Sequence, residues 1–159
     1  MNEQEKRAAL LMIPYGLYIV GVTDGESTNA FTANWVSQCS FAPPLIMMGV
    51  KKEGRAHAVL EKGRVFSVNM LAGEQKDLAA FFFRGPEAEG DRFAGRYAFE
   101  RGETGCPLLA DAPASVECRV TGLYPLGDHS VVVGEVISAR HRREAKPLTM
   151  EATGWKYGG

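Results

Sequence analysis

Uncharged polar side chains gather in one stretch of the chain, residues 29–40, with the sequence NAFTANWVSQCS. Thr32, Asn34, Ser37 and Gln38 lie there without a charged residue among them. Hydroxyl and amide groups at this density can bind the edge of a polar heterocycle or a phosphate group by hydrogen bonds alone. The other interpretation is a polar strand edge followed by a turn, and this stretch by itself leaves both open.

A second stretch, residues 49–57 (GVKKEGRAH), carries the basic side chains Lys51, Lys52 and Arg55 together with His57. It follows an apolar run that predicts a strand, and it leads into a predicted helix. The first turn of a helix offers unpaired N–H groups and the positive end of the helix dipole, which suits a phosphate group. An exposed charged turn explains the same residues, and this stretch taken alone favours that simpler interpretation.

A histidine at a predicted turn, His129 in the sequence Gly127-Asp128-His129, is the third candidate. Imidazole changes charge near neutral pH more readily than any other side chain, which suits it to a catalytic role. A histidine in a turn is more often only solvated. This residue therefore carries little weight without its neighbours.

Other catalytic or metal-binding arrangements are not predicted. No serine or cysteine has the sequence context of a nucleophile elbow, so no catalytic triad is indicated. The chain also lacks the glycine-rich motifs that open a Rossmann or P-loop nucleotide site. Cys39, Cys106 and Cys118 are too widely spaced to form a metal-ligand pair, so we expect reduced thiols and no metal site.

The elements that must position these residues are mostly strands. Apolar or alternating runs predict strands at residues 17–23, 27–40, 45–50, 65–71, 115–124 and 130–139. Helices are predicted at residues 3–12, 55–61 and 74–83, with Gly63 just past the end of the second and a hairpin turn at Asp24-Gly25. Because strands and helices do not alternate regularly, we expect a mainly β fold, an antiparallel barrel with peripheral helices.

Residues 84–109 are rich in glycine, proline and charge and match no motif. A connection this long inside a compact domain is usually functional or packed against a partner. The phenylalanine-rich stretch from Phe81 to Phe99 is expected to need a surface that covers it, which favours a homodimer.

Length and charge limit the class of protein. Residues 1–159 are expected to form a single domain. With 18 basic and 19 acidic side chains the net charge is −1, so no broad field exists to attract nucleic acid or an anionic membrane. The polar N-terminus and the apolar run broken by Pro14 and Gly16 match neither a signal peptide nor a membrane span, which predicts a cytoplasmic protein.

Four sequence motifs occur in order along the chain. They are FTANWVSQCSFAPPL at 31–45, VFSVNML at 65–71, the set Gln75, Leu78, Ala79 and Phe82, and Gly127-Asp-His followed by VGEV at 133–136. Together they resemble the flavin reductase-like family, the FMN-binding split barrels. The resemblance extends from about Ile13 to Ile137 and implies an antiparallel split β-barrel.

The resemblance also implies a role for each candidate residue. Those implied to line the flavin ring and ribityl chain are Thr32, Ala33, Asn34 and Trp35, with Ser37 and Gln38 on the same edge. Those implied to approach the ribityl chain and phosphate are Val50, Lys51, Arg55 and His57. Gln75 is implied to contact the flavin or its surroundings. His129, the implied catalytic residue, would approach the place where flavin and nicotinamide meet, from its own chain or from a second subunit.

One departure concerns the phosphate. Many members of the family carry Ser or Thr near the positions of Arg55 and Ala56, so here Arg55 and His57 are expected to substitute for those hydroxyl groups. This leaves the choice between FMN and FAD open.

The resemblance implies an FMN-binding homodimer, with FAD as the alternative flavin, that works as an NAD(P)H-dependent flavin reductase. Hydride would pass from NAD(P)H to the flavin, and electrons would go on to an acceptor such as an oxygenase component. Fold alone leaves other functions open. These are an electron-transfer or FMN-binding protein without a nucleotide site, a ferric reductase, a pyridoxamine-phosphate-oxidase-like enzyme, and an interaction module without cofactor.

Overall fold

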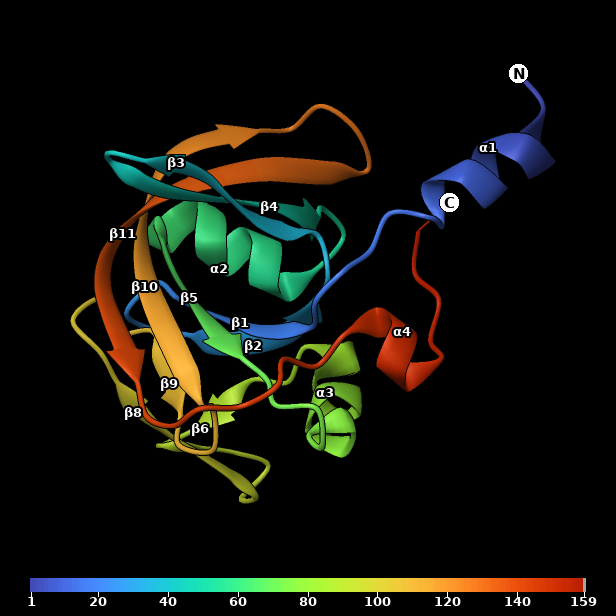
Figure 1. The fold of residues 1–159 in the computed structure, drawn as a ribbon. Helices are drawn as coiled ribbons and strands as arrows, with labels where there is room; N and C mark the ends of the chain where they lie inside the picture. Colours follow the sequence, from blue (N-terminus) through green and yellow to red (C-terminus); the bar gives the residue numbers. More distant parts are fainter. Residues whose placement is uncertain (159) are drawn as a thin grey trace.

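The computed structural model describes residues 1–158, whose main feature is a seven-stranded antiparallel sheet with the order β2-β1-β5-β10-β11-β4-β3. The strands are β1 Tyr18–Thr23, β2 Thr28–Ala33, β3 Val36–Phe41, β4 Pro44–Lys51, β5 Val65–Met70, β10 Ala114–Tyr124 and β11 His129–His141. The two edge strands, β2 and β3, are joined only by Asn34 and Trp35 and do not pair with each other. The sheet therefore curls without closing, which confirms the predicted split barrel (Figure 1).

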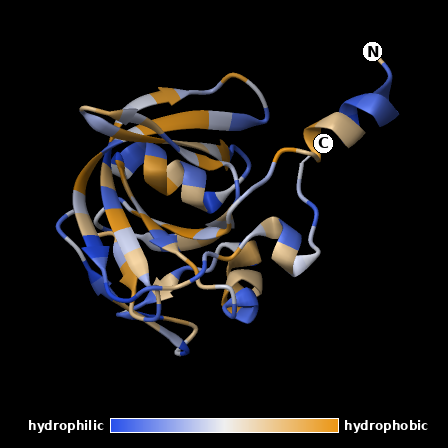
Figure 2. Ribbon diagram, in the orientation of Figure 1, coloured by the Kyte–Doolittle hydropathy of each residue, from blue (hydrophilic) through white to orange (hydrophobic). Residues whose placement is uncertain are grey.

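Helix α2, Arg55–Gly63, lies inside the curled sheet (Figure 1). Its Ala56, Val59 and Leu60 belong to one hydrophobic core with side chains from β1, β2, β4, β5, β10 and β11. Figure 2 shows hydrophobic residues on the strands around this helix and on the helix itself. Because the core holds α2 in the sheet, the first turn of the helix has a fixed position relative to the ends of β2 and β4.

The end of α2 differs from the sequence prediction in one detail. Gly63, expected just past the helix, is its last residue, and Arg64 takes the left-handed conformation with φ 58°. A Cβ atom at position 63 would lie 1.9 Å from the carbonyl oxygen of Thr23. Glycine is therefore required here because the helix approaches the backbone of β1 closely, and the left-handed residue comes one position later.

The single strand predicted at residues 27–40 is wrong, because the chain leaves the ladder at Asn34 and Trp35. β2 pairs with β1, whereas β3 pairs with β4 at the opposite edge of the sheet. Both halves have strand-like composition, so the pattern does not mark the break. The hairpin predicted at Asp24-Gly25 is confirmed: the Asp24 carboxylate accepts hydrogen bonds from the backbone N–H groups of Glu26 and Ser27.

The long connection at residues 84–109 forms a second, small sheet of four strands. They are β6 Ala88–Glu89, β7 Arg92–Phe93, β8 Tyr97–Arg101 and β9 Pro107–Leu109, preceded by helix α3, Lys76–Phe81, and the turn η1, Phe82–Arg84. Phe82, Phe93 and Phe99 are buried together in a second hydrophobic core. These three rings are thus covered within the chain itself and need no second subunit, whereas Phe83 of the same stretch is exposed.

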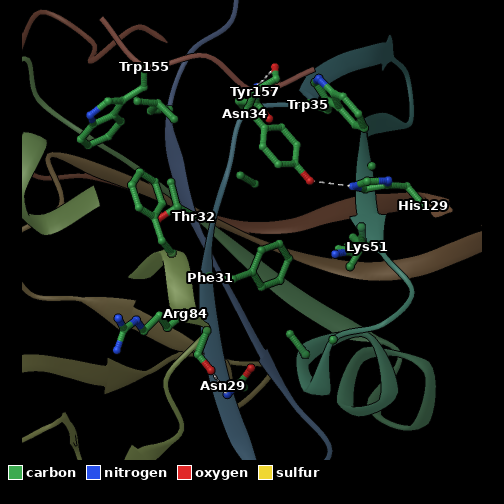
Figure 3. Close-up of a pocket in the computed structure, with 18 of the residues that line it drawn as sticks. Asn29, Phe31, Thr32, Asn34, Trp35, Lys51, Arg84, His129, Trp155 and Tyr157 are labelled. Carbon is green, nitrogen blue, oxygen red and sulfur yellow. Dashed lines mark hydrogen bonds between the residues drawn. The ribbon is translucent and has the colours of Figure 1, made fainter. Parts of the chain in front are cut away.

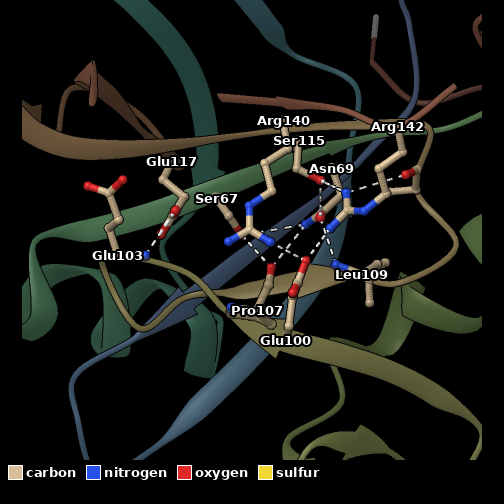
Figure 4. Close-up of polar contacts among 11 residues, drawn as sticks. Ser67, Asn69, Glu100, Glu103, Pro107, Leu109, Ser115, Glu117, Arg140 and Arg142 are labelled. Atoms are coloured by element: carbon tan, nitrogen blue, oxygen red, sulfur yellow. Dashed lines mark hydrogen bonds and ion pairs between the residues drawn. The ribbon is translucent and has the colours of Figure 1, made fainter. Parts of the chain in front are cut away.

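A network of buried polar groups ties the small sheet to the barrel (Figure 4). The Oδ1 atom of Asn69, on β5, accepts hydrogen bonds from Leu109 N and Ser115 Oγ, both at 2.9 Å. Its Nδ2 atom donates to the carbonyl oxygens of Ile19 and Pro107. Nearby, the buried Glu117 carboxylate accepts three hydrogen bonds, two from backbone N–H groups and one from the Thr104 hydroxyl.

The two ends of the chain lie on the same side of the barrel (Figure 1). Helix α1, Glu3–Leu10, buries none of its residues and projects away from the body. Helix α4, Met150–Thr153, packs near α3 and is followed by Gly154 in the left-handed conformation. The chain then continues as a tail without regular structure. In the described part of the chain, residues 1–158, we find no helix with the length and apolar character needed to cross a membrane.

Candidate functional site

A cavity with a volume of about 670 Å³ lies where the sheet is split. One wall is β2 with the Asn34-Trp35 crossover, and a second is the end of β4 with the first turn of α2. The turn at Phe83–Gly85, the side chain of His129 and the C-terminal tail complete it (Figure 3). Its size is typical of a site for a small molecule or cofactor.

Residues from two separate stretches, 29–40 and 49–57, thus meet at one cavity together with His129, which is distant in the sequence. The candidate residues that line it are Thr32, Ala33, Asn34, Trp35, Val50, Lys51, Arg55 and His129. The fold explains this meeting, because β2 and β3 diverge at the crossover and α2 is buried directly behind the opening.

Two of the remaining candidates, Ser37 and Gln38, lie on β3 beyond the crossover. Their side chains are exposed and hydrogen-bond to the backbone of their own strand, Ser37 to Gln38 and Gln38 to Ser40. They line a second, smaller hollow with Val36, Leu45 and other apolar residues. The break between β2 and β3 is the reason, since it sends this half of the polar stretch to the opposite edge of the sheet.

His57 and Gln75 also lie outside the cavity, because each side chain serves the fold. His57 is buried on the core side of α2, where its Nε2 atom lies 2.7 Å from Ser130 Oγ. Gln75 closes the loop before α3 by accepting from Ala72 N and donating to Asp111 O, both at 2.8 Å.

The charged groups of the cavity lie mainly at the start of α2. Gly54, the residue before this helix, has no side chain to cap it. His57 N donates to Gly54 O, which leaves the N–H groups of Arg55 and Ala56 to bind an anion. The guanidinium of Arg55 forms an exposed ion pair of 2.7 Å with Glu87. Arg84 is exposed across the cavity, and among residues 1–158 no acidic side chain pairs with it. These groups together form a cationic end.

The opposite end is aromatic. The rings of Trp35 and His129 lie 4.7 Å apart, and the Tyr157 ring lies 5.4 Å from Trp35. His129 bonds through Nδ1 to the Asp128 carboxylate and through Nε2 to the Tyr157 hydroxyl, each at 2.9 Å. The hydrogen bond with His129 lowers the pKa of Asp128, which keeps that carboxyl ionised. A flat ring with a phosphate would match both ends of this cavity.

The model of the family described as "Flavin reductase like domain" matches residues 10–158 of the chain. The chain belongs to this family. Within it, the "NADH-dependent FMN reductase AsuE2" of Streptomyces nodosus subsp. asukaensis is 39% identical over 137 residues, which cover 83% of this chain and 71% of that protein. Some relatives are much longer: the chain spans 24% of diflavin flavoprotein A 1 of Synechocystis, with 33% identity.

Solved structures of this family have the same fold as the chain. The NADH:FAD oxidoreductase SgcE6 of Streptomyces globisporus superposes with a TM-score of 0.82 at 30% identity, covering 94% of this chain and 89% of that one. BorF, the flavin reductase component of a bacterial two-component tryptophan halogenase, superposes with a TM-score of 0.79 at 29% identity, covering 96% and 95%.

Several lining residues of this flavin reductase-like protein were not predicted. They are Asn29 and Phe31 on β2, Phe83, Arg84 and Gly85 after α3, and Trp155, Lys156 and Tyr157 of the tail. Phe31 opens the most specific motif, and Asn29 lies in the polar stretch, so both could have been included. No sequence pattern marks the tail or the turn at 83–85 as part of the cavity, because only folding brings these segments beside β2.

Thiols and metal ligands do not shape the cavity of this flavin reductase-like protein. Cys39 is exposed on β3, whereas burial raises the pKa of Cys106 and of Cys118 to about 12. No group of three or more His, Cys, Asp or Glu side chains within residues 1–158 is arranged to hold a metal ion.

Two buried side-chain atoms within residues 1–158 have no hydrogen-bond partner: Asn29 Oδ1 and Trp35 Nε1. Both residues line the cavity. Buried polar atoms in folded proteins are nearly always paired, and exceptions often mark a site where a ligand or an ordered water supplies the partner. One acceptor and one donor of the cavity wall are therefore unused by the chain.

Proposed function

We propose that this protein is an NAD(P)H-dependent flavin reductase that binds FMN, with FAD as the alternative flavin and NADH as the electron donor. The observation that carries the proposal is the single cavity in which Thr32–Trp35, the end of β4 and the start of α2 meet. The family resemblance assigns these segments to the flavin. The 39% identity to a protein named NADH-dependent FMN reductase supports the same activity.

The residues present fit a flavin with a phosphate. The uncapped first turn of α2 and the basic side chains of Arg55 and Arg84 would hold the phosphate. Phe31 and Trp35 offer aromatic surface to the ring system. The unpaired Asn29 Oδ1 can accept a hydrogen bond from a ribityl hydroxyl, and the Thr32 hydroxyl, which already donates to Ala79 O, can also accept one.

A bound flavin supplies the redox chemistry, because it takes a hydride from the reduced nicotinamide and releases electrons to an acceptor. The role of the chain's own residues is to bind the flavin and to orient the nicotinamide. Asp128 fixes the His129 ring through Nδ1, so Nε2 points toward the aromatic end of the cavity. We assign His129 the role of orienting the nicotinamide beside the flavin.

Flavin binding is tested by titrating the protein with FMN, FAD and riboflavin while tryptophan fluorescence is recorded. Trp35 lines the cavity, so bound flavin should quench its emission, with micromolar or tighter affinity for FMN. Oxidation of NADH with excess FMN then tests catalysis. A protein that binds no flavin would overturn the proposal, and one that binds FMN without oxidising NADH or NADPH would be an electron-transfer protein instead.

A homodimer is part of the proposal. Its support is an exposed apolar surface on neighbouring strands, where Phe41 on β3, Met47 on β4 and Val131 on β11 are 91%, 43% and 38% exposed. Light scattering should give twice the chain mass of 17.3 kDa. Phe41→Asp should weaken the dimer, and a wild-type monomer at micromolar concentration would contradict this part.

Electrons from the reduced flavin are proposed to reach an oxygenase or halogenase component. The support is BorF, which is named as the reductase component of such a system. Adding a candidate oxygenase to the protein, FMN and NADH should give substrate oxidation that stops when any one component is omitted. Ferric chelates, the alternative acceptor, should then compete for the reduced flavin.

The proposed location is the cytoplasm. Three free thiols and dependence on a nicotinamide coenzyme suit a reducing compartment that holds NADH. Fractionation of cells that express the protein should recover it with a cytoplasmic marker enzyme, and recovery with the envelope would contradict this location.

A further inference from the structure

The C-terminal tail, residues 155–158, crosses the aromatic end of the cavity. It is anchored on one side by α3: the Trp155 ring packs 4.7 Å from Phe83 and lies under the Lys76 ammonium at 5.2 Å. From there the tail continues to Tyr157, whose ring points into the cavity toward His129 (Figure 3). The tail is therefore held at Trp155 by α3 and η1, and Tyr157 near its tip lies over the cavity.

Tyr157 contacts three residues that the family resemblance assigns to the flavin and nicotinamide. Its hydroxyl bonds to His129 Nε2 at 2.9 Å, and its ring lies 5.4 Å from Trp35. Its backbone carbonyl accepts a long hydrogen bond of 3.4 Å from Asn34 Nδ2. The side chain remains 48% exposed, so it lies over the site without being part of a core.

The hydrogen bond to Tyr157 occupies the nitrogen of His129 that a ligand would meet. The ionised Asp128 carboxylate accepts a hydrogen bond from Nδ1–H. In the neutral imidazole Nε2 then carries a lone pair and accepts a hydrogen bond from the Tyr157 hydroxyl. As long as this bond exists, a ligand cannot use Nε2.

The tail covers the Trp35 indole without offering its N–H group a hydrogen-bond acceptor. Gly158 lies against its indole: a Cβ atom at position 158 would be 3.4 Å from Cζ2 and 3.7 Å from Nε1. The tail thus helps to bury the indole N–H, yet no atom within residues 1–158 accepts from it. An unpaired buried donor is unfavourable, so an occupant that offers an acceptor would be preferred to the tail.

We propose that Tyr157 holds the place of the nicotinamide ring in the ligand-free protein and that a reduced pyridine nucleotide displaces it from His129. The inference rests on the proposed function. A nicotinamide is a flat ring with a carboxamide, which offers an N–H to His129 Nε2 and a carbonyl to Trp35 Nε1. His129 Nε2 loses its partner when the tail departs, and Trp35 Nε1 already lacks one in the ligand-free protein. Tyr157 therefore sets the affinity for the coenzyme.

The ligand-free protein gives the first test. Nitrogen-15 NMR of the wild-type imidazole should show the proton on Nδ1 and a hydrogen-bonded Nε2 for His129, and Tyr157→Phe should remove the second feature alone. The Trp35 indole N–H should exchange with water faster in Tyr157→Ala. Tyr124→Ala is the matched control, because Tyr124 is 52% exposed and lies outside the cavity lining. An unchanged His129 signal in both Tyr157 variants would overturn the contact.

The second test separates the tail from the flavin site. Removing a competing hydrogen bond should lower KM for NADH about threefold to tenfold in Tyr157→Ala, with a smaller effect in Tyr157→Phe. The Kd for FMN should stay within about twofold of the wild type. Normal FMN binding with an unchanged KM would refute the displacement while leaving the proposed function intact. Absence of FMN binding in the wild type would refute the proposed function, and the NMR tests would still decide whether Tyr157 holds His129.

Discussion

Two of the regions that bury polar side chains differ in how these are paired: the Asn69 network beneath the small sheet and the cavity wall at β2 and Trp35. Asn69 is fully buried, and both its Oδ1 and its Nδ2 are paired with groups of the chain. Asn29 is also buried, but only its Nδ2 is paired, with the carbonyl oxygens of Gly85 and Pro86. The difference separates polar groups that hold the fold from those that keep hydrogen-bonding capacity for a ligand.

The largest expected effect is a loss of stability when the Asn69 network is broken. Asn69→Ala would leave Leu109 N–H and the Ser115 hydroxyl without their buried acceptor, so unfolding in urea should show a stability loss of about 2–5 kcal/mol. The Kd for FMN of the folded variant should equal that of the wild type. The control is Asn2→Ala, which removes an exposed helix cap and should cost about 1 kcal/mol or less. A large loss of FMN affinity in Asn69→Ala would contradict the conclusion that this network serves the fold alone.

The cavity wall should behave in the opposite way. Arg55→Ala should change stability little, because its ion pair with Glu87 is exposed. It should weaken FMN about tenfold to a hundredfold, since a charge-assisted hydrogen bond contributes about 1.5–3 kcal/mol. Riboflavin, which lacks the phosphate, should lose much less affinity. Equal losses for the two flavins in fluorescence titrations would mean that Arg55 shapes the turn and does not bind the phosphate.

A smaller effect on FMN affinity is expected from Glu87, the ion-pair partner of Arg55. Glu87 holds the Arg55 guanidinium at 2.7 Å and so competes with a phosphate for it. Glu87→Gln should therefore raise the affinity for FMN, by up to about fivefold if the exposed pair contributes 1 kcal/mol or less. The gain should shrink in high salt, because screening weakens the pair in the wild type as well. A similar gain for riboflavin would point to a general change of the loop.

The smallest effect concerns a polar cluster at the β1–β2 hairpin, which belongs to neither region. The backbone N–H of Ser27, together with Lys62, lowers the pKa of the Asp24 carboxyl to about 2 from its usual 3.8. A lowered pKa in the folded state stabilises above the unfolded value and is lost as the pH falls through the folded value. The stability advantage of wild type over Asp24→Asn should thus be full above pH 5 and decline toward pH 2. A constant difference in urea midpoints across this range would contradict it.

The sequence by itself determined most of the framework. Alternating and apolar runs located nearly every strand of the barrel, and Asp24-Gly25 located the β1–β2 hairpin, because strand periodicity and turn chemistry are local properties. The motif at residues 31–45 and the Gly-Asp-His turn indicated the family, and they include many of the residues that line the cavity. Local chemistry also placed the start of α2 at Arg55, next to a glycine.

Only the tertiary structure decided which residues face the cavity and which serve the fold. His57 and Arg55 lie two positions apart, yet burial of α2 turns His57 toward Ser130 and leaves Arg55 at the opening. Ser37 and Gln38 share a polar stretch with Thr32, but the crossover at Asn34-Trp35 sends them to another edge of the sheet. The direction of a side chain in a helix or across a strand break depends on which neighbours bury it, and those neighbours are distant in sequence. Tyr157 reaches His129 for the same reason: the contact joins residues that only the folded barrel brings together.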